Sequence, residues 1–334
     1  MIKTLIVDDS SLVRTILRDF LESEGSFEVI DEAENGQDGV NKARFLNPDL
    51  ITMDYQMPEM NGLDAIEEVR KFSSCGIVMI STHDTAKMAY DATVKGAHDF
   101  FSKDMFTAQM TDRQRNDIFN TLKQITNIRK KAPVLQENIS SSLKASQKIS
   151  CIVIAASTGG PMALCQLCSG LPEDFPVPIL LVQHNTSGFD KGFAQWLDSY
   201  AKISVTLAEE NVLPLKGNLY VAPTDKHLII GDNGLDFDDS APLNNQKPAA
   251  DILFKSAAKK YGNELIGIVL TGMGNDGAAG IKNIKKSDGI TIAQDEETSM
   301  IYGMPLAAVE TGCIDMILPL NEIAEKLISL TAES

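Results

Sequence analysis

The feature that most constrains this chain is a repeated alternation of short apolar runs with longer stretches of helical periodicity. In residues 1–122, five apolar runs are each followed by a stretch in which apolar residues recur at helical spacing. The runs are residues 4–7, 27–30, 49–53, 77–80 and 98–101. Repeated βα units are typical of a doubly wound parallel sheet, an α/β fold that binds ligands at the carboxyl ends of its strands. We therefore predict five βα units, the last ending in a helix over residues 106–124.

A second alternation of the same kind occupies residues 150–334. Its clearest apolar runs are residues 151–156, 177–183, 265–270 and 290–293, and turn signals punctuate a β-rich stretch at 203–237. This pattern predicts a second doubly wound α/β domain with a β-rich insertion. The segment between the two, residues 123–149, has a Ser triplet and no sustained period, so it is predicted to be an interdomain linker.

The charge of the chain divides at the same boundaries. The net charge of −16 is the sum of −10 in residues 1–122, +5 in the linker and −11 in residues 150–334. Nucleic-acid binding requires clustered Lys and Arg, so this distribution argues against a nucleic-acid partner. The apolar runs are much shorter than the ~20 residues of a membrane span, so no membrane insertion is expected.

The N-terminus and the cysteines indicate a cytoplasmic protein. MIKTLIVDDS has no room for the apolar core of a secretory signal. Five scattered cysteines fit a reduced compartment better than a disulfide framework. Cys165 and Cys168 fall within an apolar helical stretch and are predicted to be buried small side chains, not metal ligands.

Three carboxylates are predicted to meet in the first domain. Asp8 and Asp9 follow the first apolar run and Asp54 ends the third. Parallel strands end at one edge of the sheet, so these like charges need a cation among them. A hard divalent ion, most plausibly Mg²⁺, fits oxygen ligands. The alternative is that these are solvated loop residues.

Two further groups are expected at the same edge. Thr82 follows the fourth run and Lys103 the fifth, which supplies a hydroxyl and an ammonium group. With Mg²⁺, this set suits phosphoryl transfer onto a carboxylate, because the cations offset the charge of the transferred group.

These residues carry a specific resemblance. The segments DD (8–9), MDYQMPEMNG (53–62), STHD (81–84) and DFFSK (99–103) resemble the flavodoxin-like receiver domain of two-component response regulators. The resemblance implies that Asp54 is the phosphoacceptor and that Thr82 and Lys103 are the switch pair. It further implies a magnesium site formed by Asp8, Asp9, Asp54 and the backbone carbonyl of Gln56. Receivers usually have proline after the lysine, where this chain has Asp104.

In the second domain, a serine follows the first strand. Ser157-Thr-Gly-Gly-Pro is a tight turn into a helix N-terminus, which would expose the serine hydroxyl. A serine nucleophile needs a base, and the candidates in this domain are His184 and His227. His184 is favoured because it directly follows a strand and so lies at the same sheet edge. The alternative for the turn is a phosphate or nucleotide cradle.

A carboxylate that orients the histidine is expected from another strand end. Asp276 lies in TGMGNDGAAG, after the run at 265–270, and this glycine-rich loop could also present an N–H group to an oxyanion. The alternatives are that Asp276 caps the following helix and that His184 is an ordinary loop histidine.

The second half also resembles a known family. The segments that carry the resemblance are AASTGGP (155–161), QH (183–184), APTDKH (222–227), LTGMGNDGAAG (270–280), IAQDEETS (292–299) and YGMP (302–305). They are similar to the catalytic domain of the chemotaxis protein-glutamate methylesterases, and the order receiver, linker, esterase covers nearly the whole chain.

This resemblance implies a phosphorylation-activated enzyme that demethylates glutamate methyl esters, and deamidates glutamines, on methyl-accepting chemotaxis receptors. Ser157 would be the nucleophile, His184 the general base and then acid, Asp276 the group that orients the imidazole, and the Met273 backbone N–H an oxyanion donor. It also implies a chemotaxis histidine kinase as phosphodonor, a receiver that covers the active site until it is phosphorylated, and no cofactor in the catalytic domain.

Two segments depart from the family pattern. Asn185, Thr186 and Ser187 replace an apolar, proline-containing stretch, and Gln246 and Lys247 stand where arginines are usual. Lysine cannot reproduce the bidentate geometry of arginine. The alternative function is therefore a retargeted or weakly active paralogue that acts as a phosphorylation-dependent signalling adaptor.

Overall fold

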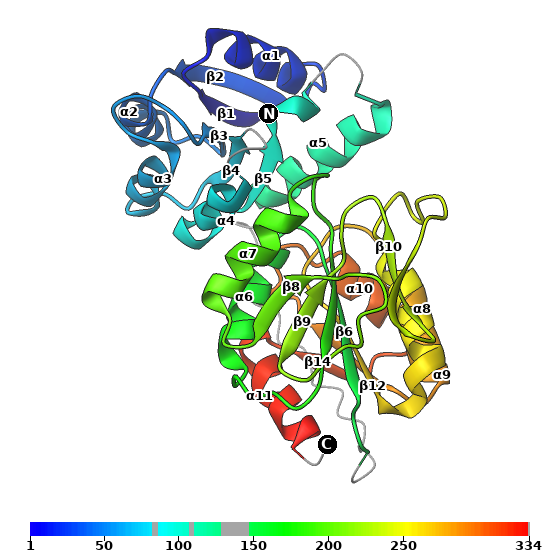
Figure 1. The fold of residues 1–334 in the computed structure, drawn as a ribbon. Coiled ribbons are helices and arrows are strands. Elements are labelled where there is room, and N and C mark those ends of the chain that lie inside the picture. The colour runs from blue at the N-terminus through cyan, green and yellow to red at the C-terminus, as the bar shows by residue number, and fades with distance from the viewer. Residues whose placement is uncertain (82–85, 107–109, 128–146, 333–334) are drawn as a thin grey trace. The chain divides into compact units, whose positions relative to one another are not determined.

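The computed structural model describes the chain except for residues 82–85, 107–109, 128–146 and 333–334 (Figure 1). The chain divides into two compact units, Met1–Ala132 and Pro133–Ser334, and each is described by itself. Among the described residues, no helix is both long and apolar enough to cross a membrane.

The first unit is a five-stranded parallel sheet in the order β2-β1-β3-β4-β5. Its strands are β1 (Ile2–Val7), β2 (Phe27–Ala33), β3 (Leu50–Asp54), β4 (Gly76–Ser81) and β5 (Asp99–Ser102). Its helices are α1 (Ser11–Glu22), α2 (Gly36–Leu46), α3 (Gly62–Arg70), α4 (Ala86–Lys95) and α5 (Asp112–Asn127). The predicted five βα units and the α/β fold class are confirmed.

The first unit extends further along the chain than the sequence suggests. Helices α1 and α5 share one core, in which the Phe20 and Phe119 rings stack 4.5 Å apart. Ile125 belongs to the same core, so α5 continues to Asn127, past the predicted boundary at residue 122. The expected start of this helix at residue 106 is wrong, because Phe106 ends a 3₁₀ turn at Lys103–Met105 with a non-helical ψ of 63°, and α5 begins at Asp112. Residues 128–146 of the predicted linker lie outside the described residues.

The second unit contains a seven-stranded parallel sheet in the order β14-β13-β12-β6-β7-β9-β8. The strands are β6 (Cys151–Ala156), β7 (Ile179–Gln183), β8 (Ser204–Leu207), β9 (Asn218–Val221), β12 (Leu265–Val269), β13 (Ile290–Gln294) and β14 (Met316–Leu318). The helices are α6 (Gly160–Gly170), α7 (Asp190–Tyr200), α8 (Ala250–Tyr261), α9 (Ala278–Lys286), α10 (Met304–Val309) and α11 (Leu320–Thr331). The short elements α10 and β14 are not among the predicted elements, although Pro305 in the first turn of α10 and the apolar run of β14 are signals for them.

The β-rich stretch is only partly an insertion. Strands β8 and β9 extend the main sheet, whereas β10 (His227–Gly231) and β11 (Gly234–Asp238) form a separate antiparallel hairpin. Cys168 on α6 is buried, as predicted, while Cys165 on the same helix is half-buried.

A partly buried histidine makes the stability of the first unit depend on pH. His98 Nδ1 accepts a hydrogen bond of 3.0 Å from the Ile77 N–H. Burial, with the nearby charge of Arg70, lowers the His98 pKa from 6.5 to about 4. Because the folded pKa lies below the unfolded one, the stabilisation is complete above pH 6.5 and is lost as pH falls toward 4, at about 1.4 kcal/mol per unit.

The variant His98→Asn keeps an acceptor for Ile77 but cannot take up a proton. Between pH 7 and pH 5 the wild type should therefore lose about 2 kcal/mol of stability relative to this variant. Hydrogen exchange of the β4 amides in the full-length protein measures that difference at each pH. A constant difference across the range would contradict the prediction.

Candidate functional site

The predicted carboxylates of the first unit do meet at the carboxyl ends of β1 and β3. Single oxygen atoms of Asp8, Asp9 and Asp54 all lie within 4.8 Å of one another. Asp8 and Asp54 are buried, and Lys103 Nζ lies 2.9 Å from a carboxylate oxygen of each. Asp9 is exposed. The donor set consists of hard oxygens with excess negative charge, which fits Mg²⁺.

Burial and mutual repulsion shift the titration of these groups. Burial, with the charge of Asp8, raises the Asp54 pKa to about 6 despite the opposing effect of Lys103. Burial likewise raises the Asp8 pKa. Burial alone would lower the pKa of Lys103, but its contacts with the two carboxylates outweigh this and raise it. The pocket therefore holds one ammonium group where a further cation would relieve the remaining repulsion.

The backbone around the pocket requires particular residues. A Cβ on Gly62 would lie 2.0 Å from the Asp54 carbonyl oxygen, so the end of β3 and the start of α3 can approach only with glycine there. After Lys103, the Asp104 N–H donates to Ser102 Oγ at 3.3 Å, a bond that the proline usual in receivers could not donate. Gln56 lies in the loop directly after β3. Thr82 falls outside the described residues.

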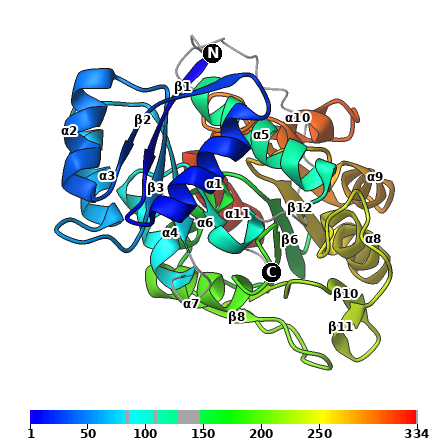
Figure 2. The ribbon, with the colours of Figure 1, turned by 90° about the horizontal axis from the view of Figure 1, so that it is seen from above.

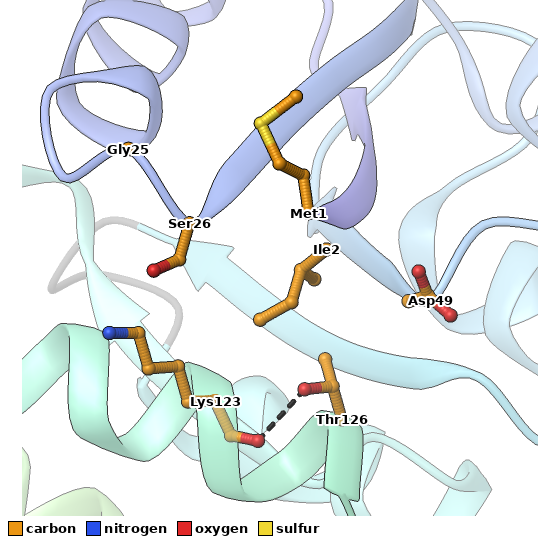
Figure 3. A pocket seen from close by; sticks show the side chains of 7 residues that line it. All are labelled: Met1, Ile2, Gly25, Ser26, Asp49, Lys123 and Thr126. Atoms are coloured by element: carbon orange, nitrogen blue, oxygen red, sulfur yellow. Dashed lines mark hydrogen bonds between the residues drawn. The ribbon is translucent and has the colours of Figure 1, made fainter.

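A separate pocket of the first unit lies at the amino-terminal ends of the strands, whereas the carboxylates lie at the carboxyl ends (Figure 3). Its volume is about 570 Å³, and it is lined by Met1, Ile2, Gly25, Ser26, Asp49, Lys123 and Thr126. Ile2, Ser26 and Asp49 lie at or just before the starts of β1, β2 and β3. In a parallel sheet this edge is remote from the one that carries Asp8 and Asp54, so the pocket is no part of the carboxylate site.

In the second unit, Ser157 follows β6 in a tight turn. The Gly160 N–H donates to the Ser157 carbonyl at 2.8 Å, and Gly159 has φ = 76°, a left-handed conformation that favours glycine. The Ser157 N–H donates to the Thr271 carbonyl at 3.1 Å. The turn is thus attached to the loop that follows β12.

His184 and Asp276 form the pair that the strand ends predicted. His184 Nε2 lies 2.8 Å from Asp276 Oδ2, although the residues are 92 positions apart in the chain. The other ring nitrogen, Nδ1, is buried and has no hydrogen-bond partner among the described residues. With Nε2 occupied by the carboxylate, Nδ1 is the nitrogen available to take a proton.

His227, the other candidate base, has a structural role. It is fully buried; its Nδ1 accepts the Ala249 N–H at 3.0 Å and its Nε2 lies 3.3 Å from the Ala241 carbonyl. Both ring nitrogens therefore serve to hold the chain that leads into α8. The sequence preference for His184 agrees with this geometry.

Asp276 also caps a helix, although this helix is α8 and not the following helix, α9, that the alternative named. Its oxygens accept hydrogen bonds from the Ala250 N–H (2.7 Å) and the Asp251 N–H (3.0 Å), at the start of α8. In return, Asp251 accepts the Gly280 N–H of α9 at 2.6 Å. Helices α8 and α9, which lie side by side in both views (Figures 1 and 2), are thus capped reciprocally. The sequence did not predict the contacts of Asp276 with α8 or of Asp251 with α9.

The ionisation of Asp276 follows from these contacts. Burial opposes its negative charge, but the hydrogen bond with His184 and the backbone donors of α8 outweigh that cost. They hold the Asp276 pKa below its ordinary value. The carboxylate is therefore available to stabilise a protonated imidazole.

The loop that contains Met273 passes against the serine. A Cβ on Gly272 would lie 2.7 Å from Ser157 Cβ. The Gly272 carbonyl accepts the N–H groups of Gly303 (3.1 Å) and Met304 (2.8 Å), which fastens the loop to the start of α10. Met273 is thereby placed one residue from the contact with Ser157, and its role as oxyanion donor stays a prediction.

The two segments that depart from the family pattern are connected through a third residue, Asp225. Ser187 Oγ donates to Asp225 Oδ2 at 2.6 Å, and the Asp225 N–H donates to the Lys247 carbonyl at 3.2 Å. Asp225 therefore joins the loop after His184 to the segment before α8. The sequence contains no signal for this contact, because its three members are far apart in the chain.

The fold and the two sites define a class of protein: a receiver-type unit with a carboxylate pocket, joined to an α/β unit in which a His–Asp pair and a serine follow the ends of parallel strands. Comparison with protein-family models agrees. The response regulator receiver domain matches residues 4–115, and the CheB methylesterase domain matches residues 152–327. The chain belongs to the CheB methylesterase family.

Individual relatives extend over nearly the whole chain. A protein of Pyrococcus horikoshii is 38% identical over 98% of this chain and 93% of its own length, and one of Thermotoga maritima is 36% identical over 99% and 98%. Both are named protein-glutamate methylesterase/protein-glutamine glutaminase. The crystal structure of the T. maritima CheB methylesterase catalytic domain is 39% identical, has a TM-score of 0.54, and covers 55% of this chain and 100% of that one. The predicted family, fold class and enzyme class are confirmed.

Proposed function

We propose that this chain is a phosphorylation-activated serine hydrolase that demethylates glutamate methyl esters, and deamidates glutamines, on methyl-accepting chemotaxis receptors. The observation that carries the proposal is the His184–Asp276 pair at 2.8 Å, on the same sheet edge as the half-buried Ser157. The names of the full-length relatives support the substrate class.

The chemistry follows from the roles proposed for this site. Ser157 Oγ attacks the ester carbonyl carbon while His184 Nδ1 takes its proton, and Asp276 stabilises the imidazolium. Backbone N–H groups of the Met273 loop face the oxyanion. Methanol leaves with the proton from His184, and a glutamyl ester of Ser157 remains. Water then attacks this ester, gives a proton to His184 and releases glutamate, and Ser157 recovers its proton. A glutamine substrate follows the same path and releases ammonia.

The first unit is proposed to control this reaction. Asp54 accepts a phosphoryl group from a chemotaxis histidine kinase, with Mg²⁺ held by Asp8, Asp9, Asp54 and the Gln56 carbonyl. The ion would supply positive charge to the transferring phosphoryl group. Lys103 contacts two of these carboxylates before phosphorylation. Phosphorylation of Asp54 changes the partners of Lys103, and Lys103 and Thr82 together transmit this change.

The activating role of Asp54 is tested by adding a small-molecule phosphodonor and Mg²⁺ to the full-length protein. Hydrolysis of a receptor methyl ester should rise by about 5–150-fold, the usual range of coupling between two sites. Asp54→Asn should abolish the rise and leave the basal rate, because Asp54 belongs to the other unit. A fragment of residues 150–334 should be faster than the unphosphorylated whole. An equal or slower fragment would contradict inhibition by the first unit.

The adaptor alternative makes a different prediction at Ser157. A protein that only binds a partner needs no activated serine, so a fluorophosphonate probe would leave it unlabelled. The hydrolase is expected to be labelled at Ser157, and the adduct can be located by mass spectrometry of the digested protein.

A further inference from the structure

Gln183, the last residue of β7, contacts the backbone of both residues proposed to react together. Only 2% of its surface is exposed. Its side-chain Nε2 donates two hydrogen bonds of 3.0 Å, one to the Ser157 carbonyl and one to the His184 carbonyl. One buried amide group therefore connects the chain segments of the nucleophile and the base.

This connection begins where the backbone pairing ends. Ala156 and Gln183 are the last register partners of β6 and β7, and the His184 N–H donates to the Ala156 carbonyl at 3.0 Å. Beyond this point Ser157 enters the turn to α6 and His184 enters the loop to α7. The hydrogen bonds of the Gln183 side chain thus extend the connection between β6 and β7 one residue beyond the last paired residues.

The surroundings leave the Gln183 side chain little freedom. A Cβ on Gly160 would lie 2.1 Å from Gln183 Oε1, so the amide packs against the first turn of α6. The Ser157 N–H, in turn, donates to the Thr271 carbonyl, and the Thr271 N–H donates to Gln294 Oε1 at 2.8 Å. The turn of Ser157 is therefore fixed at both ends by buried groups.

We propose that Gln183 is a positioning residue for hydrolysis, which sets the approach of Ser157 Oγ to His184 Nδ1 by holding the two carbonyls. The proposal rests on the function proposed above for Ser157 and His184. Gln183 itself touches neither the substrate nor the transferred proton. Both partners are acceptors, so the role requires a side chain that donates two N–H bonds, which glutamine can do and glutamate cannot.

Two variants of the full-length protein test this role. Gln183→Met fills the space without an N–H group, and Gln183→Glu keeps the shape but presents acceptors to both carbonyls. With phosphodonor and Mg²⁺ present, kcat for ester hydrolysis and the rate of fluorophosphonate labelling should fall by about 10–100-fold, because small misplacements of reacting groups are costly. KM should change by less than about twofold, since substrate binding is untouched.

Thr291→Val is the matched control, because it also removes a buried donor. Thr291 Oγ1 donates to the Cys313 carbonyl at 2.6 Å and contacts Asp315 rather than the loops of Ser157 and His184. The unfolding midpoint of Thr291→Val should fall while its kcat is unchanged.

If the Gln183 variants lose stability in the same way but keep kcat, Gln183 is merely structural and the proposal is wrong. If Gln183→Met does not fold, Gln183→Glu decides by the same criterion. Labelling of the wild type that survives in Ser157→Ala would instead overturn the proposed function.

Discussion

Replacing Ser157 with alanine is expected to lower kcat for ester hydrolysis by about 10⁴–10⁶-fold, the loss typical of removing a serine nucleophile. The variant keeps the Ser157 backbone contacts with Thr271, Gly160 and Gln183, which involve only its N–H and carbonyl groups. In the wild type, the Ser157 hydroxyl makes no hydrogen bond to another described residue. Stability should therefore be nearly unchanged, which separates lost chemistry from lost folding.

The measurement compares methanol release from a receptor methyl ester by the wild type and by Ser157→Ala, each with phosphodonor. Ser169→Ala is a suitable control, because Ser169 is exposed on the helix that follows the turn and its hydroxyl bonds only to the Gln166 carbonyl of the same helix. Activity of Ser157→Ala close to that of the control would exclude a serine mechanism at this position.

Asp276→Asn is expected to reduce both activity and stability, because all four partners of this carboxylate are donors. Oδ2 faces His184 Nε2 and the Ala250 N–H, and Oδ1 accepts the N–H groups of Asp251 and Gly277. An asparagine NH₂ group would meet another donor on either side. We expect kcat to fall by about 10³–10⁴-fold through loss of imidazole orientation, and stability to fall by about 2–4 kcal/mol through the unpaired buried groups.

Asp251→Asn is the matched control for this variant. Asp251 caps α9 through the Gly280 N–H, and its second oxygen accepts from Asn244 Nδ2 at 3.2 Å. An asparagine there can accept the first bond through Oδ1 and, once the Asn244 side-chain amide turns over, donate its NH₂ group to Asn244 Oδ1. A smaller loss of stability and an unchanged kcat are therefore expected. Chemical denaturation and ester hydrolysis on the same samples distinguish the two effects. An Asp276→Asn protein that loses stability but keeps kcat would show that Asp276 is only a helix cap.

Most of the candidate site could be predicted because its residues directly follow strands. Asp8, Asp54, Ser157 and His184 each lie at or just after the end of an apolar run, and parallel strands bring such ends to one edge. The glycine-rich loop that holds Asp276 also has a strong local pattern. By contrast, following the apolar spacing alone places the start of α5 too early. Its local signal is the capping box of Thr111 and Gln114, in which the Gln114 N–H donates to Thr111 Oγ1 and the Thr111 N–H donates to Gln114 Oε1.

The sequence by itself determined the two α/β units, the family, and the set of residues at the strand ends, because hydrophobic periodicity and motif spacing are local properties of the chain. Only the tertiary structure decided that His184 presents Nδ1 and that His227 is a structural residue. It also decided that Asp276 caps α8 and that the Gln183 amide joins Ser157 to His184. These contacts link loops up to 92 positions apart, and their geometry depends on how the sheet and helices pack around them, which no local pattern encodes.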